Sequence, residues 1–387
     1  MVSKYKKSGT NYIVVIALTV LFHVFNNLQI NETIKLFHLF AIGTIVLGLF
    51  LHKSKTNIVN RSFALVIIWA LVTSLLSPIS ASYLNMLKFL IISLSVLFLP
   101  YVSFDKLITY INIVIPIALT ALIAESIRNF IYRFQGFYED PNYFCTTLLV
   151  FYFYIQLYWN KTKKIWIKTL LLVEILLIAY LVAISISRTG MACFLLMTIA
   201  FWWEQFMKNK TKSVIAIFIL LGCIYYFYKD MIDVAIEGYT MREESSNDSL
   251  GSASEHRWKI SLSGLSFLFS HPLYWIQGIG IGTFRHGYEL QGWHSYTNLI
   301  DHNTLTCWFT EQGIIGIILL FRFFALLCFK IYNSSYLKLT KLRIPCLSVF
   351  FVFLIFSASI NQTTYFPFWF LLLTLVSISN ETPKFSK

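Results

Sequence analysis

Long apolar stretches recur along almost the whole sequence, and they decide what this chain can fold into. A helix needs about 20 apolar residues to cross the ~30 Å hydrocarbon core of a membrane. Backbone polar groups inside that core must be paired within the segment, so each stretch is expected to be a helix. We therefore predict an all-α polytopic membrane protein with about 12 transmembrane helices. The predicted spans are 12–29, 34–51, 62–77, 82–100, 107–124, 143–159, 165–186, 189–206, 213–228, 303–322, 343–360 and 364–379.

One long polar segment, residues 229–302, separates the ninth predicted span from the tenth. It divides the chain into residues 1–228, with transmembrane helices 1–9, the loop 229–302, and residues 303–387, with helices 10–12. Composition agrees with this organisation, since 57% of the residues are hydrophobic and only 13% are charged.

The basic residues predict which side of the membrane each loop faces. Cytoplasmic loops of membrane proteins carry an excess of Lys and Arg. Most of the 31 Lys and Arg residues fall on one side if both termini are cytoplasmic, and the long loop is then extracytoplasmic. The basic start of the chain could belong to a signal peptide, but no small-residue cleavage site follows, so we interpret the first span as a retained anchor. The net charge of +13 thus reflects topology, and we predict no nucleic-acid partner.

No pattern in the sequence indicates a metal site or a cofactor. The cysteines occur singly in predicted spans, without a nearby Cys or His partner, and are interpreted as small hydrophobic residues. The glycines of "GIGIG" (278–282) lack the spacing and the βαβ context of a dinucleotide-binding loop. The cysteines are Cys145, Cys193, Cys223, Cys307, Cys328 and Cys346.

An arginine interrupts the apolar sequence where spans seven and eight meet, in "SISRTG" (185–190). An arginine at the end of a span is often an anchor whose charge reaches the lipid headgroups. Here the turn is too short to leave a proper loop, which favours an arginine held in a cavity, where a charge marks a functional site. We therefore predict a functional role for Arg188 on the extracytoplasmic side.

The second part of the long loop has the pattern of an amphipathic helix. Ser252 and Glu255 form a capping box. Apolar residues then recur at helical spacing, which predicts a helix lying on the membrane surface with Arg257 on its polar face. The alternative for Arg257 is a solvated helix face. The apolar residues are Trp258, Leu262, Leu265 and Phe269.

His302 stands at the mouth of the tenth span, on the same predicted side as Arg188 and Arg257. It could also be an interfacial or helix-capping residue. Arginine suits bidentate recognition of phosphate, and histidine takes up a proton near neutral pH. Together they fit a lipid-linked pyrophosphate substrate. Two other charged residues lie within spans: Glu174 must find a partner in the membrane, and Lys88 can extend its charge outward.

Taken in order, the motifs resemble those of the O-antigen polymerase and O-antigen ligase superfamily. The resemblance covers roughly residues 134–320. It is carried by "DPN" (140–142), "SISRTG", Arg257-Trp258, "GIGTF" (280–284) and "HN" (302–303) followed by "EQGIIG" (311–316).

The resemblance implies a metal-independent glycosyltransferase in the bacterial inner membrane. Its donor would be a glycan linked to undecaprenyl pyrophosphate, with membrane lipid around it, and a chain-length regulator protein is a candidate partner. Arg188 and Arg257 would hold the pyrophosphate and stabilise its developing charge. His302 would position or deprotonate the acceptor hydroxyl. The residues expected to bind substrate are Arg285, Asp140, Asn142, Arg133 and Glu311.

Three activities stay open at this point. The first is a polymerase that joins repeat units of a surface polysaccharide such as O-antigen or capsule. The second is the O-antigen ligase, which transfers the glycan to lipid A core; the Ile-Asp before His302 departs from the ligase pattern and favours the polymerase. The third is a flippase or other transporter of the same lipid-linked sugar. A translocation pathway would need ionisable residues at several depths, and Glu174 is nearly alone at mid-membrane.

Overall fold

A computed structural model describes residues 2–25, 28, 35–51, 57–128, 134–138, 140–208, 253–293 and 301–382, with only the backbone for 2–8, 204–208 and 253–257. In these ranges the chain is helical and forms no strand, which confirms the all-α prediction. The longer helices are α1 (Val2–Val24), α2 (Leu36–Leu49), α3 (Ile58–Leu75), α4 (Ala81–Leu97), α5 (Phe104–Arg128), α6 (Pro141–Lys161), α7 (Ile165–Ile184), α8 (Arg188–Lys208), α10 (Ala253–Ser270), α12 (Thr304–Asn333), α14 (Arg343–Ser357) and α15 (Phe366–Ser379). The short elements are η1 (Leu99–Tyr101), α11 (Pro272–Gln277), η2 (Phe284–Glu289) and α13 (Ser335–Leu339).

Every predicted span except the ninth coincides with a described helix; the ninth, 213–228, lies outside the described residues. Five described helices are long and apolar enough to cross a membrane: α3, α4 with η1, α5, α7 and α12. Shorter apolar helices lie within α1, α2, α8, α14 and α15. The chain is therefore a multi-pass membrane protein by length and composition, and the number of twelve spans stays a prediction.

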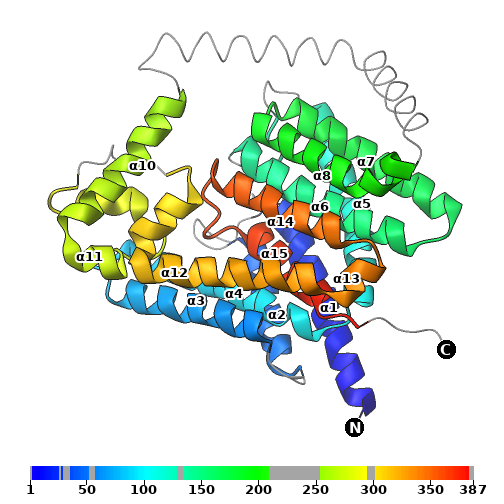
Figure 1. Ribbon diagram of the computed structural model, residues 1–387, viewed down its shortest axis with the longest axis horizontal. Coiled ribbons are helices and arrows are strands. Elements are labelled where there is room, and N and C mark those ends of the chain that lie inside the picture. The colour runs from blue at the N-terminus through cyan, green and yellow to red at the C-terminus, as the bar shows by residue number, and fades with distance from the viewer. Residues whose placement is uncertain are drawn as a thin grey trace.

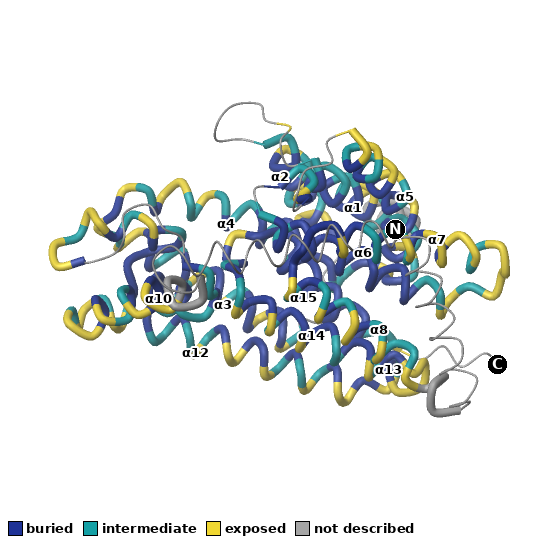
Figure 2. Tube along the Cα trace, turned by 90° about the horizontal axis from the view of Figure 1, so that it is seen from above, coloured by how far each residue is buried: buried dark blue, intermediate teal, exposed yellow. Residues whose placement is uncertain are grey.

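Helix α15 forms the centre of the helical bundle. All fourteen of its residues are buried, because α4, α6, α12 and α14 pack around it. Figure 2 shows α15 as a buried segment in the interior of the molecule. A helix that is apolar all round, as "FPFWFLLLTLV" (366–376) is, suits such a buried position.

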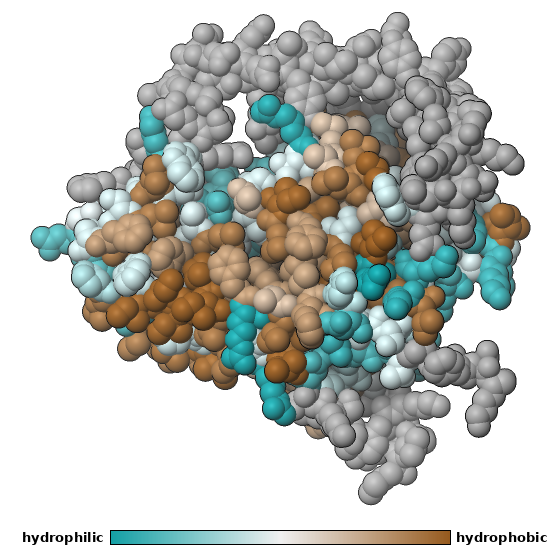
Figure 3. Space-filling view, in the orientation of Figure 1, coloured by the Kyte–Doolittle hydropathy of each residue, from teal (hydrophilic) through white to brown (hydrophobic). Residues whose placement is uncertain are grey.

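The surface of the bundle is apolar, as lipid contact requires. Large hydrophobic side chains are exposed along α3 and α12, among them Ile68 (54%), Ile318 (58%) and Phe321 (51%). Figure 3 shows apolar side chains gathered over the part of the surface that α3 and α12 form in Figure 1. An apolar patch of this extent marks a membrane-facing surface in a polytopic protein.

The two ends of the bundle differ in what they contain. At one end the start of α3 meets the end of α15, where the Asn57 Nδ2 donates to Asn380 Oδ1 at 2.7 Å, and the Phe104 backbone N–H donates to Glu381 Oε1 at 3.2 Å. At the other end lie α10, α11 and η2, over the start of α12 (Figure 1). The described part of the long loop thus lies at the end opposite to the start of α3 and the end of α15.

Helix α10 begins directly after Ser252, where a helix is predicted, although Ser252 itself lies outside the described residues. It runs across the direction of α3 and α12 in Figure 1. Its buried face packs over α12, and three of the predicted apolar residues point away from the protein. The exposed fractions are 59% for Trp258, 42% for Leu262 and 66% for Phe269, so the apolar face is available for lipid. Residence on the membrane surface stays a prediction.

The "GIGIG" loop passes between the α3–α4 turn and a kink in α12. The kink is at Gly313, whose φ of 65° is left-handed. A Cβ there would lie 2.2 Å from the Ile276 carbonyl oxygen, and a Cβ on Gly278 would lie 2.3 Å from the Glu311 carbonyl oxygen. The Gly280 N–H donates to the same Glu311 oxygen at 2.9 Å. Two main chains therefore meet here at a distance that only glycine permits.

Candidate functional site

The "SISRTG" turn is built to begin α8 at Arg188. Ile186 has a φ of 52°, which turns the chain sharply after α7. The Ser187 hydroxyl accepts a hydrogen bond from the Gly190 N–H at 3.0 Å, the usual geometry of a helix N-cap. A Cβ on Gly190 would lie 2.6 Å from Cys145 Sγ, so this glycine lets α8 pack closely on α6. Arg188 is exposed at the first position of α8.

The start of α6 holds this turn in place. The Ser187 hydroxyl donates to Asn142 Oδ1 at 2.7 Å, and both side chains are buried. Asp140 caps α6 by accepting from the Asn142 backbone N–H at 2.7 Å. Asp140 and Asn142 were predicted to bind substrate; the contacts described here make both of them supports of the Arg188 turn. Arg133, predicted with them, lies outside the described residues.

A second set of hydrogen bonds joins the start of α6 to the start of α12. The Tyr143 hydroxyl donates to the Asn361 carbonyl at 2.5 Å, and Asn361 Nδ2 donates to Cys307 Sγ at 2.9 Å. The Thr304 hydroxyl donates to the Ile360 carbonyl at 2.7 Å. The segment between α14 and α15 therefore links the start of α6, which holds the Arg188 turn, to the start of α12, next to His302. Asn361 was not predicted from the sequence.

Next to His302, Asp301 is fully buried and joins α10 to the start of α12. Its Oδ1 accepts from the Ser261 hydroxyl at 2.7 Å and from the Asn303 backbone N–H at 2.9 Å, and its Oδ2 accepts from the Thr306 hydroxyl. Burial raises the pKa of Asp301, and these three hydrogen bonds act in the opposite direction. The half-buried His302 is thus fixed between a buried carboxyl group and the cap of α12.

Asp301 also connects the start of α12, next to His302, to the part of α10 that contains Arg257. The backbone of Arg257 lies in α10, four residues and hence one helical turn before Ser261. Ser261 is the residue of α10 that donates to Asp301. The structure therefore brings the α10 turn that carries Arg257 close to the start of α12, although the Arg257 side chain is outside the described part.

The starts of four helices add partial positive charge to that of the arginines. α6, α8, α12 and α15 all begin in this region, each with N–H groups at its first turn that carry partial positive charge. Their starts are joined by the bonds from Ser187 to Asn142, from Tyr143 to Asn361, and from Tyr365 to Tyr143 (2.5 Å). Arginines and converging helix N-termini together favour an anionic ligand such as phosphate.

Two further predicted residues lie beside the "GIGTF" loop. The Glu311 side chain is 1% exposed, and its Oε1 accepts from the Phe284 backbone N–H at 3.1 Å. A direct contact between Glu311 and substrate would need this loop to move, so its observed role is to hold the loop. Arg285 follows Phe284 and is exposed on η2, where it donates to His286 Nε2 at 3.2 Å.

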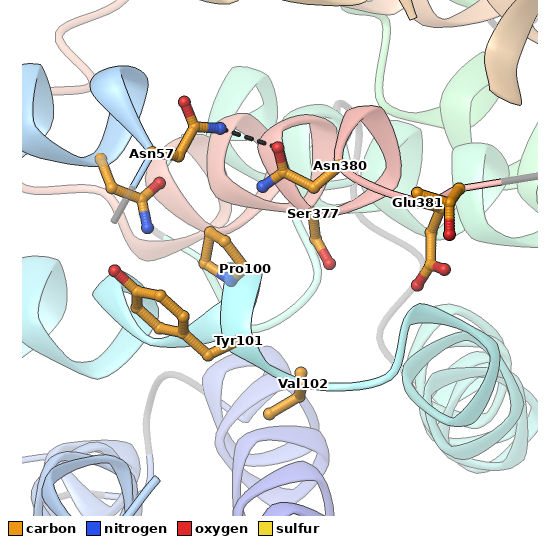
Figure 4. A pocket seen from close by; sticks show the side chains of 9 residues that line it. Asn57, Pro100, Tyr101, Val102, Ser377, Asn380 and Glu381 are labelled. Atoms are coloured by element: carbon orange, nitrogen blue, oxygen red, sulfur yellow. Dashed lines mark hydrogen bonds between the residues drawn. The ribbon is translucent and has the colours of Figure 1, made fainter. Parts of the chain in front are cut away.

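A polar cavity at the opposite end of the bundle is not part of this site. Figure 4 shows Asn57, Tyr101, Ser377, Asn380 and Glu381 around it. These residues come from the start of α3, from η1 and from the end of α15. Among the described residues, no group of three or more His, Cys, Asp or Glu side chains is placed to hold a metal ion. A reaction without metal stays a prediction.

A comparison with known families matches part of the chain. Residues 173–321 match the protein family described as O-antigen ligase. The resemblance to the O-antigen polymerase and ligase superfamily is therefore confirmed over this stretch. It runs from α7 through the "SISRTG" turn to α12 and includes Arg188, Arg257 and His302. The O-antigen ligase match implies a glycosyltransferase-like enzyme with a lipid-linked glycan as substrate. No curated protein matches the chain.

Proposed function

We propose that this chain is a polysaccharide polymerase that joins undecaprenyl-pyrophosphate-linked repeat units at the outer face of the bacterial inner membrane. The observation that carries the proposal is the hydrogen-bonded connection between the start of α8, with Arg188, and the start of α12, with His302. Arg257 belongs to the same arrangement through Ser261 and Asp301. An arginine and a histidine held at neighbouring helix starts suit a reaction that releases a pyrophosphate and removes a proton.

In this reaction the acceptor hydroxyl attacks the anomeric carbon of the donor glycan. The bond between that carbon and the pyrophosphate oxygen breaks, and the lipid pyrophosphate leaves with the electron pair. Arg188 and Arg257 stabilise the charge that grows on the leaving oxygen, since fixed cations act most strongly where charge develops. His302 takes the proton of the hydroxyl. No metal or cofactor is needed for this balance.

A ligase that transfers the finished glycan to lipid A core is the second candidate. The description of the matching family favours it. The donor and the proton transfer would be the same, so the same arginines and histidine would serve. The two activities differ only in the acceptor, and they are separated by what accumulates when the enzyme is missing.

The test is a gel ladder of surface polysaccharide from a deletion strain complemented with variants. Arg188→Ala and His302→Ala are expected to reduce long polymer at least about a hundredfold, because each removes a group that acts in the transition state. Arg188→Lys is expected to restore little, since an ammonium cannot form the planar bidentate contact. Arg128→Ala, at the exposed end of α5, is the matched control and should leave the ladder unchanged.

The deletion strain distinguishes the candidates. A single repeat unit on lipid A core identifies a polymerase, and long polymer that stays on the lipid carrier identifies a ligase. A full ladder from Arg188→Ala and His302→Ala, with the protein present in the membrane, would contradict both activities. Glycan trapped on the cytoplasmic side in the deletion strain would instead support a flippase.

A further inference from the structure

A second group of cations lies outside the Arg188 site. Lys88 is half-buried in α4, seven residues and therefore about 10 Å from the start of that helix. Arg285 of η2 lies three residues after Gly282, whose carbonyl bonds to Asn85 one turn before Lys88, and the two positive charges repel each other. α4 packs on α2, α3 and α15, whereas α8, which carries Arg188, packs on α6, α7 and α14. The two groups therefore belong to different parts of the bundle.

The fold holds Lys88 and Arg285 together in spite of their repulsion. Asn85, one turn before Lys88, donates through Nδ2 to the Gly282 carbonyl at 2.7 Å. A Cβ on Gly282 would lie 2.6 Å from the Asn85 side chain, so the loop approaches α4 as closely as a backbone can. Glu311 fixes the next part of the loop through the Phe284 N–H. Arg285 follows directly, so its backbone is held beside this part of α4.

The described residues around Lys88 and Arg285 offer no carboxylate that compensates their positive charge. Within the described parts of the chain, no carboxylate lies within salt-bridge distance of Lys88 or Arg285. The nearby Glu289 pairs with His286 Nδ1 at 3.5 Å. On the other side, the charge of Lys88 also acts on the buried His38 of α2. Like charges that are held together by the backbone are costly unless an anion binds between them.

We propose that Lys88 and Arg285 form a second anion site, separate from Arg188, which binds a phosphate group carried by a membrane lipid. Lys88 lies about two turns inside α4, and its flexible side chain can extend the ammonium toward the start of the helix, where a lipid headgroup would lie. Arg285 supplies a planar guanidinium for two phosphate oxygens. The anion would neutralise both cations at once.

The lipid can be one of two kinds. In a polymerase the acceptor, like the donor, carries a lipid pyrophosphate, and this second site would hold the acceptor while Arg188 holds the donor. That assignment rests on the proposed function. A phospholipid headgroup offers the same phosphate chemistry and would be bound whatever reaction the chain performs.

The experiment counts lipids bound to the purified full-length protein by native mass spectrometry. The probes are farnesyl pyrophosphate and phosphatidylglycerol, each titrated in detergent micelles. The double variant Lys88→Ala, Arg285→Ala is expected to lose one bound pyrophosphate, with an affinity at least about tenfold lower at that site. Arg188→Ala should lose the other. Arg128→Ala is the control and should bind as wild type does.

A loss confined to phosphatidylglycerol would support the anion site with a lipid headgroup as its ligand. Wild-type binding of both probes by the double variant would overturn the proposal. Because the alanines could disturb packing, Lys88→Gln and Arg285→Gln are measured as well. The elution profile of each variant checks that it is folded. Wild-type binding by folded glutamine variants counts against the site. If Arg188→Ala leaves the polymer ladder intact while the double variant still loses its anion, the proposed function fails and this site stands.

Discussion

At the scale of single residues, Asp301 makes the most specific prediction. It accepts hydrogen bonds from Ser261, from the Asn303 backbone and from Thr306, and it stands directly before His302. Asp301→Asn keeps the shape but turns an acceptor into a donor, which leaves a buried hydroxyl or amide without its partner at a cost of about 1–3 kcal/mol. We expect polymer synthesis to fall about tenfold or more at normal protein level, measured from the gel ladder against Western-blot signal.

The same residue predicts a dependence on pH. Because burial raises the pKa of Asp301 above its ordinary value, the folded protein binds this proton more tightly than the unfolded chain. The contribution of Asp301 to stability is therefore greatest below the ordinary pKa and is lost as pH rises through the raised one. The melting temperature of the wild type, minus that of Asp301→Asn, should decrease from pH 4 to pH 7. A difference that increases over this range would show that the carboxylate is favoured in the folded state.

The site residues predicted from the sequence differ in a physical way from those that only the structure indicates. Arg188 was recognisable because a charge is costly in an apolar stretch, and His302 because it stands at a span end. Asp301 stands two residues before Asn303, the N-cap of α12, where an aspartate has the pattern of an ordinary turn residue. Asn361 contacts Tyr143 and Cys307, which are distant in sequence, and no local sequence pattern predicts such contacts.

At the scale of the elements, the meeting of α11 and α12 can be tested by adding a methyl group. Gly313→Ala places a Cβ at left-handed φ and 2.2 Å from the Ile276 carbonyl oxygen. The strained conformation alone costs about 1–3 kcal/mol, and the clash adds to it. We expect a lower melting temperature in detergent and a shorter polysaccharide ladder, since the loop that carries Arg285 packs on this kink.

Gly43→Ala in α2 is the matched control for that change. Its Cβ would lie 3.4 Å from Val15 Cγ1, an ordinary contact, and its backbone is helical. Its melting temperature should equal or exceed that of the wild type, because alanine favours a helix over glycine. Equal melting temperatures for Gly313→Ala and Gly43→Ala would mean that the two main chains do not meet as closely as described.

Sequence patterns predict most of the helices but not the kink in α12. Apolar length predicted the helices α1–α8, α12, α14 and α15, because hydrocarbon leaves the backbone few alternatives. The helix α10 followed from its periodicity. The kink of α12 did not, since Gly313 within "EQGIIG" looks like any glycine in an apolar helix. Its conformation is set by the "GIGIG" loop, which is distant in sequence.

At the scale of the whole molecule, the predicted topology can be tested at the two ends of the bundle. Ser270, at the end of α10, and Ser335, at the start of α13, are both exposed and tolerate a conservative change to cysteine. With cytoplasmic termini, Ser270→Cys should react with a membrane-impermeant maleimide in intact spheroplasts. Ser335→Cys should react only after permeabilisation. The parent protein is the control for its own cysteines: Cys145, Cys193, Cys307 and Cys346 are buried, Cys328 is half-buried, and Cys223 lies outside the described residues.

The labelling experiment also tests the proposed reaction, because that reaction requires the site to face the outer side of the membrane. Arg188, the α10 turn before Ser261, and His302 lie toward the end that carries Ser270, so all of them face the compartment in which Ser270→Cys reacts. A lipid-linked glycan that has crossed the membrane is found only on the outer side. Labelling of Ser335→Cys alone in intact spheroplasts would place the arginines and His302 in the cytoplasm, where a polymerase or ligase of this kind has no substrate.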